Sequence, residues 1–191
     1  TKTPNQIDPD IIRTIKALIR KGEAIAGARF VGLPDENIHF QDLPFYDRTK
    51  FSKDVSFEDD IQQTMELLRQ VKPHQVFAAG DFHDPHGTHK VCFDIILEAL
   101  LRLRATEEWA KDCWLWLYRG AWYEYPIHEI EMAVPLSPQE VTRKRLAIFK
   151  HQSQKDIPVF PGDDPREFWV RAEDRTSDTA AIYHKLGLAD Y

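Results

Sequence analysis

The stretch that decides the fold prediction is Val76-Phe77-Ala78-Ala79-Gly80-Asp81-Phe82-His83-Asp84-Pro85-His86-Gly87-Thr88-His89-Lys90. An apolar run leads into a polar loop with three histidines and two aspartates, and apolar residues then recur at helical spacing as far as Leu103. This order predicts a strand, a loop and a helix. Proteins of the α/β class bind ligands beyond the carboxyl ends of their strands, so residues 81–90 form the candidate site.

The flanking sequence repeats the alternation of helices and strands. Further helices are expected from residue 8 into the mid-twenties and at 56–72, 137–151 and 165–187. Ser137 and Glu140 have the spacing of a capping box, and Gly187 is the expected C-terminal cap of the last helix. Further strands are expected at 29–33, 113–118 and 130–134, with 113–118 apolar enough to be buried on both faces. The pattern indicates an α/β fold whose mostly parallel sheet is flanked by helices, in a Rossmann-like arrangement.

The composition is that of a globular protein. The 191 residues are 42% hydrophobic and 29% charged, which suits one domain over 1–191, with 156–191 as a C-terminal helical extension. The net charge of -6 argues against nucleic acid and anionic membranes as partners, and we see neither a membrane-spanning run nor a signal peptide. Cys92 and Cys113 lie in apolar segments, so we expect free thiols in a cytoplasmic protein. Because the chain begins with Thr1 and not methionine, it is expected to be part of a longer protein.

His86 and His89 are three residues apart where the loop meets the helix, which suits two metal ligands. Neutral imidazole is the commonest metal ligand, but a catalytic zinc needs three protein ligands and an open position. Asp84 could be a third ligand or could orient a histidine, whereas His83 is expected to be an exposed loop residue. The alternative is a solvated loop whose Asp and His residues cap the following helix.

Two groups of residues outside the loop are open to more than one interpretation. The aromatic stretch 109–125 could stack on a sugar, although we favour core positions for Trp114 and Trp116 and leave Trp122 and Tyr123 open.

The second group is charged. Arg20 and Glu23 could bind substrate or form a solvated pair one helical turn apart, and Lys90 at a helix start suggests an anionic partner. Charged residues near the end of the chain are most simply a surface ion network: Arg171, Glu173, Asp174 and Arg175.

Several segments, in order, resemble motifs of the PIG-L/LmbE-type zinc-dependent N-deacetylases, over roughly residues 11–155. Residues 84–90 resemble the D-x-H-P-D-H-R motif, and 20–23 resemble the R-x-x-E helix. Residues 33–35 resemble the L-P-D turn, and 144–154 resemble the late K-x(n)-H-x-S-Q helix. Residues 168–175 are also similar to a segment in the C-terminal half of long bacterial proteins labelled glucosamine-6-phosphate deaminase-like.

The resemblance implies zinc as cofactor and an amino sugar as substrate. By position, His89 would bind zinc, His86 would be the general acid or oxyanion donor, and Asp84 would support them. The remaining ligands and the water-activating aspartate of the family come from an A-H-P-D-D motif, which is absent from this chain. Gly87 and Thr88 also replace the Pro-Asp of the second motif. We therefore expect a domain that lacks its first βα unit and is inactive by itself.

Two functions remain open at this point. One is a zinc-dependent N-deacetylase-like hydrolase domain of amino-sugar metabolism, with Arg20, Glu23 and Lys90 as substrate-binding residues. The other is a non-catalytic assembly or sugar-binding module attached to a glucosamine-6-phosphate deaminase-like protein. Beyond an amino sugar, the expected partners are a second copy of the chain, paired through an exposed sheet edge, or a fused deaminase-like domain.

Overall fold

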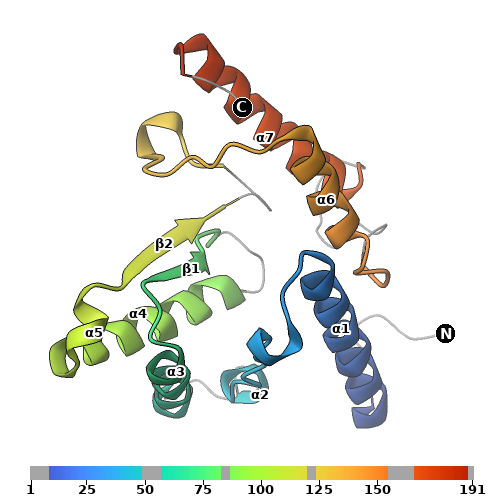
Figure 1. Cartoon of the computed structure of the whole chain (residues 1–191). Coiled ribbons are helices and arrows are strands. Elements are labelled where there is room, and N and C mark those ends of the chain that lie inside the picture. The colour runs from blue at the N-terminus through green and yellow to red at the C-terminus, as the bar shows by residue number, and fades with distance from the viewer. Residues whose placement is uncertain (1–8, 49–56, 83–86, 120–123, 155–165, 189–191) are drawn as a thin grey trace. The chain divides into compact units, whose positions relative to one another are not determined.

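The computed structural model describes residues 9–48, 57–82, 87–119, 124–154 and 166–188 (Figure 1). The chain divides into two compact units. Phe40–Pro126 form one, here called the sheet unit, and Thr1–His39 with Ile127–Tyr191 form the other, here called the helical unit. Each unit is described by itself.

The sheet unit is built around two parallel strands. Strand β1 (Gln75–Ala79) pairs with β2 (Trp114–Tyr118), with Gln75 opposite Trp114 and Ala79 opposite Tyr118. The helices α4 (Thr88–Thr106) and α5 (Glu108–Lys111) connect them, and α3 (Glu58–Val71) packs against α4 (Figure 1). The predicted strand and helix on either side of residue 81 are thus confirmed as the first half of a parallel β-α-β connection.

The core of the sheet unit lies between α3, α4 and one face of the sheet. Its most buried side chains come from α3 and α4, from the short helix α2 (Phe45–Arg48), from α5 and from the residue before β2: Phe45, Ile61, Met65, Leu68, Ile95, Ala99, Leu100, Leu103, Ala110 and Cys113. Asp60 is also buried, and its Oδ1 accepts a hydrogen bond from the backbone N–H of Phe45 at 2.9 Å. That bond ties α2 to the first turn of α3.

The prediction that residues 113–118 are buried on both faces is wrong. Val76 and Leu115 stand opposite each other and pack against the core. On the alternate positions, Trp114 is 65% exposed and Phe77 is 56% exposed. The described helices of this unit cover the Val76 face of the sheet. The prediction that Trp114 is a core residue is therefore wrong. Its ring stacks on that of Trp116, which is half-buried.

The helical unit contains α1 (Asp10–Phe30), α6 (Pro138–Ile148) and α7 (Phe168–Lys185), with the short 3-10 turns η1 (Asp35–Asn37) and η2 (Ile127–Glu129). Helix α6 contacts both α1 and α7. Between α6 and α7, Arg145 forms a two-pronged ion pair with Glu173 at 2.6 and 2.7 Å. The same guanidinium lies 4.6 Å from the centre of the Trp169 ring.

The predicted strand at 29–33 is wrong, because α1 continues past the mid-twenties to Phe30. Gly32 adopts φ +98°, its N–H donates to Arg29 O, and the Leu33 N–H donates to Ala28 O. These two bonds form a Schellman motif, in which a glycine ends the helix by adopting the left-handed conformation. The glycine that was interpreted as part of a strand is the end signal of the helix.

The predicted strand at 130–134 is also wrong, because these residues have no regular secondary structure. The capping box before α6 is confirmed: Ser137 and Glu140 exchange side-chain and backbone hydrogen bonds. The end of α7 is confirmed as well, with Gly187 at φ +75° in a second Schellman motif. The coarse α/β prediction therefore holds. In the described residues, no helix is long and apolar enough to cross a membrane.

Candidate functional site

The carboxyl ends of β1 and β2 meet at Gly80, which directly follows β1. Its N–H donates to Tyr118 O at 2.8 Å, and the Nε of Arg119 donates to its carbonyl oxygen at 3.2 Å. A Cβ on Gly80 would lie 2.8 Å from Leu117 Cβ and would also meet the hydroxyl of Tyr125. Only glycine lets the chain pass this close to β2 on its way into the loop.

Asp81 and His89 are held next to each other at this end of the sheet. Asp81 is only 2% exposed, and His89 lies in the first turn of α4. The Nδ1 of His89 lies 3.0 Å from the carbonyl oxygen of Asp81. A carbonyl can only accept, so Nδ1 carries a proton, and in the neutral form of the imidazole Nε2 has its lone pair for another partner.

Arg119 brings a positive charge to the same edge. It follows β2 directly, and its guanidinium carbon lies 4.0 Å from the centre of the Tyr125 ring. The sequence analysis singled out neither Arg119 nor the burial of Asp81. Their positions in the sequence could have indicated them, because each residue follows an apolar strand, and the carboxyl ends of parallel strands meet at one edge of the sheet.

Lys90 forms an ion pair within α4. Its Nζ lies 2.5 Å from both carboxylate oxygens of Asp94, one helical turn onward, and both side chains are about half exposed. This pair offsets the unfavourable position of a lysine at a helix start, so an anionic ligand is not required to explain it.

The other loop residues predicted for the site, namely His83, Asp84 and His86, lie outside the described residues, as do Trp122 and Tyr123. Within the described part of the chain, no group of three or more His, Cys, Asp and Glu side chains could hold a metal ion. His89 does fit as one metal ligand, because its Nδ1–H is engaged and its Nε2 is not used by that bond.

The charged pair predicted on the first helix lies in the helical unit. Both carboxylate oxygens of Glu23 accept hydrogen bonds from Ser153, one from the backbone N–H at 2.6 Å and one from the hydroxyl at 2.7 Å. Burial raises the pKa of Glu23, but the Ser153 bonds and the nearby His151 and Arg20 charges outweigh it, so the net pKa is lowered. The structure thus joins two segments far apart in sequence, 20–23 and 151–153.

A groove of about 480 Å³ lies beside this junction, between α1 and α6. Small residues such as Gly27 and Ala147 line it, and His151 packs so closely on Gly27 that a Cβ there would lie 3.3 Å from its Nε2. The bonds of Glu23 to Ser153 fasten α1 to the end of α6, which is a structural role.

Both cysteines are free thiols, as predicted, and burial raises the pKa of Cys113. The raised pKa keeps Cys113 protonated and unreactive near neutral pH.

Comparisons with known proteins give one informative result. Models of known protein families do not match this chain, and no solved structure matches it. The chain is 49% identical over all 191 residues to a protein of Bacteroides thetaiotaomicron named as glucosamine-6-phosphate deaminase-like. It spans 29% of the length of that protein. The chain is therefore similar, along its whole length, to part of a glucosamine-6-phosphate deaminase-like protein.

Proposed function

We propose that this chain contributes part of a zinc-dependent N-deacetylase-like hydrolase site that acts on an amino sugar. Two observations support the proposal: the name of the relative refers to an amino-sugar phosphate, and the Nδ1 of His89 contacts the Asp81 carbonyl oxygen, which leaves its Nε2 outside that contact. The family motif A-H-P-D-D is absent from the sequence, so we propose that this chain alone is inactive and lacks the first βα unit of a Rossmann-like, PIG-L/LmbE-type domain.

The orientation of His89 is the observation that carries the proposal. Zinc-binding histidines almost always donate the other ring N–H to a carbonyl or carboxylate, which fixes the tautomer and raises the basicity of the ligand. Here the Asp81 carbonyl accepts that N–H, and Nε2 remains to bind a metal. A zinc ion at Nε2 would supply Lewis acidity toward the amide carbonyl and lower the pKa of a bound water.

The remaining roles follow the sequence prediction. His86 would donate a proton or stabilise the oxyanion, and Asp84 would hold the histidines in place. Arg20, Glu23 and Lys90 are proposed as substrate-binding residues, of which Glu23 and Lys90 also have the partners Ser153 and Asp94.

The test is metal content combined with deacetylase activity, measured on the protein as its gene encodes it. Zinc should be present in the wild type and lost in His89→Ala, with acetate release from N-acetylglucosamine derivatives lowered more than about 100-fold. His128→Ala is the matched control, because the His128 side chain is 81% exposed and pairs with Glu129. Unchanged zinc and activity in His89→Ala would overturn the proposal.

The second candidate is a non-catalytic sugar-binding or assembly module attached to a deaminase-like domain or to a second copy of the chain. Gly87 and Thr88 in place of the family's Pro-Asp favour it, as does the Asp94 partner of Lys90. Absence of zinc together with sugar binding that survives His89→Ala would support this candidate. In either case we propose a cytoplasmic protein, which the two free cysteines support.

A further inference from the structure

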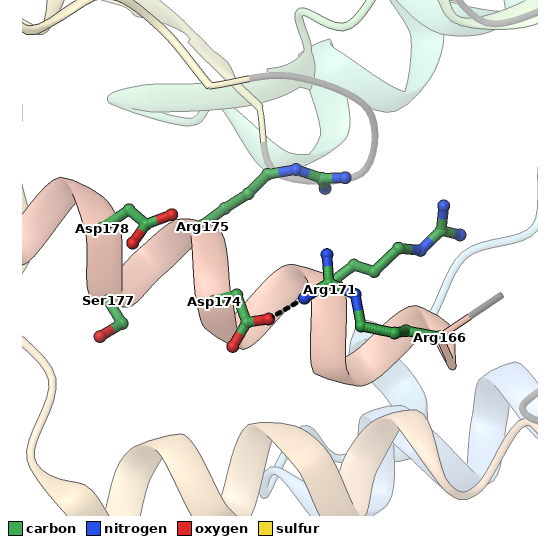
Figure 2. Close-up of a pocket in the computed structure, with 6 residues that line it drawn as sticks. All are labelled: Arg166, Arg171, Asp174, Arg175, Ser177 and Asp178. Atoms are coloured by element: carbon green, nitrogen blue, oxygen red, sulfur yellow. Dashed lines mark hydrogen bonds and ion pairs between the residues drawn. The ribbon is translucent and has the colours of Figure 1, made fainter. Parts of the chain in front are cut away.

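A hollow of about 280 Å³ on the helical unit is rich in arginine (Figure 2). Its lining comes from α7 and the residues just before it: Arg166, Arg171, Asp174, Arg175, Ser177 and Asp178. The lining residues carry three guanidinium groups and two carboxylates, so the lining has one more positive than negative charge. One carboxylate is already engaged, because Asp174 is paired with Arg166.

Arg171 and Arg175 are one helical turn apart, and their side chains extend from the same side of α7 (Figure 2). The Nε of Arg171 is buried and has no hydrogen-bond acceptor among the described residues. Burying a guanidinium N–H without an acceptor is costly, so an acceptor is expected at this position. Of the residues predicted to form a surface ion network, Asp174 does form an ion pair, but its partner is Arg166, which the prediction did not include. This pair does not explain the buried Nε of Arg171.

We propose that Arg171 and Arg175 bind the phosphoryl group of a phosphate monoester, with a sugar phosphate as the ligand class. Guanidinium groups stay charged at all working pH values and donate paired N–H bonds that match phosphate oxygens. The identification of the ligand as a sugar phosphate rests on the proposed amino-sugar function. The phosphate site itself rests on the arginines of α7.

The carboxylate of Asp178 at the same hollow opposes an anion. Replacing it with a neutral amide removes that repulsion, so Asp178→Asn is expected to tighten phosphate binding. A purely structural arginine network would lose an acid partner in this variant and would gain no affinity for phosphate.

The experiment is calorimetric titration of the full 191-residue chain at constant ionic strength with inorganic phosphate, glucosamine 6-phosphate and unphosphorylated glucosamine. Arg171→Gln and Arg175→Gln should each weaken binding of both phosphates at least about 10-fold. Arg171→Lys keeps the charge but loses the paired donors, so it should give an intermediate loss. Arg13→Gln is the control, because it removes one positive charge from α1, at a side chain that is 40% exposed and paired with Asp10. Circular dichroism of each variant checks that the fold is retained.

The outcomes separate this proposal from the proposed function. Tighter binding of the sugar phosphate than of inorganic phosphate would assign the site to a sugar phosphate. Equal affinity for glucosamine 6-phosphate and inorganic phosphate would show that the site recognises the phosphoryl group alone, and would still support the proposed phosphate site. The proposal would be overturned if Arg171→Gln left the affinity for both phosphates unchanged, or if Arg13→Gln lowered that affinity as much as Arg171→Gln does. The phosphate titration measures neither zinc content nor acetate release, so a failed zinc site would not be mistaken for a failed phosphate site.

Discussion

At the scale of single residues, Gly80 is a position of the candidate site with no space for a side chain. Its backbone is bonded on both sides, to Tyr118 O through its N–H and to the Arg119 Nε through its carbonyl. Leu117 Cβ leaves no room for a side chain, and because Cβ is fixed to the backbone, no change of rotamer relieves the overlap. Gly80 thus keeps Asp81 and Arg119 together at the carboxyl ends of β1 and β2.

We predict that Gly80→Ala lowers the free energy of unfolding by about 1–3 kcal/mol through steric overlap with β2. The matched control is Gly22→Ala, where the added methyl meets nothing within 4 Å and the residue lies inside α1. That change should raise stability by about 0.5–1 kcal/mol. Urea unfolding measures both, and a Gly80→Ala chain as stable as the wild type would contradict the close approach.

A second prediction concerns the acid range of Glu23. Its pKa is lowered in the folded state, so its bonds to Ser153 contribute fully above the ordinary glutamate pKa, and the contribution is lost as pH falls through the lower folded value. Ser153→Ala should therefore raise the pKa of Glu23 toward its ordinary value, as read from a carboxyl-carbon NMR titration. Ser177→Ala, on α7, should leave the Glu23 titration unchanged. No movement of the titration in Ser153→Ala would show that the bond is absent in solution.

At the scale of elements, the helix ends follow local rules that the sequence carries. The Ser137 hydroxyl accepts from the Glu140 N–H, and the Glu140 carboxylate accepts from the Ser137 N–H. The backbone and side-chain bonds of Ser137 lower the pKa of Glu140, so the box weakens as the pH falls and the carboxylate becomes protonated.

We predict that Ser137→Ala destabilises the chain by about 1 kcal/mol, the usual cost of losing a helix N-cap. Ser177→Ala again serves as control, since Ser177 lies in the middle of α7 and caps nothing. The difference between the two variants in thermal unfolding should shrink at acid pH, where Glu140 is protonated. A difference that is constant with pH would show that Glu140 does not take part in the cap.

At the scale of the whole molecule, apolar burial is uneven. Apart from Ala172, the buried hydrophobic side chains of the described residues belong to the sheet unit, whereas the apolar residues along the first half of α1 are exposed. Leu18 and Ile11, for example, are 63% and 66% exposed. The sheet unit is therefore expected to be the most stable part of the chain.

We predict that Leu103→Ala, at a side chain with no exposed surface, costs about 2–5 kcal/mol, while Leu101→Ala, at 51% exposure on the same helix, costs little. Hydrogen exchange followed by mass spectrometry should show slower exchange for residues 95–104 than for 11–19. The reverse order would place the stable core in the helical unit.

The sequence alone determined most of the secondary-structure elements and the chemical character of the loop between β1 and α4. Apolar runs located β1 and β2, apolar residues at helical spacing located α4, and capping signals located the start of α6 and the end of α7. It failed at 29–33 and 130–134, because a short apolar run does not show whether it extends a helix, forms a strand or stays irregular. At 29–33 the answer depended on the φ of Gly32.

Only the tertiary structure decided which residues meet. The pairing of Glu23 with Ser153, and of Gly80 with Tyr118 and Arg119, joins positions that no local rule connects. The tautomer of His89 likewise follows from the Asp81 carbonyl beside it, and the exposure of Trp114 follows from which face of the sheet the helices cover. Local preferences are written in neighbouring residues, whereas hydrogen bonds and burial between distant ones depend on how the elements pack.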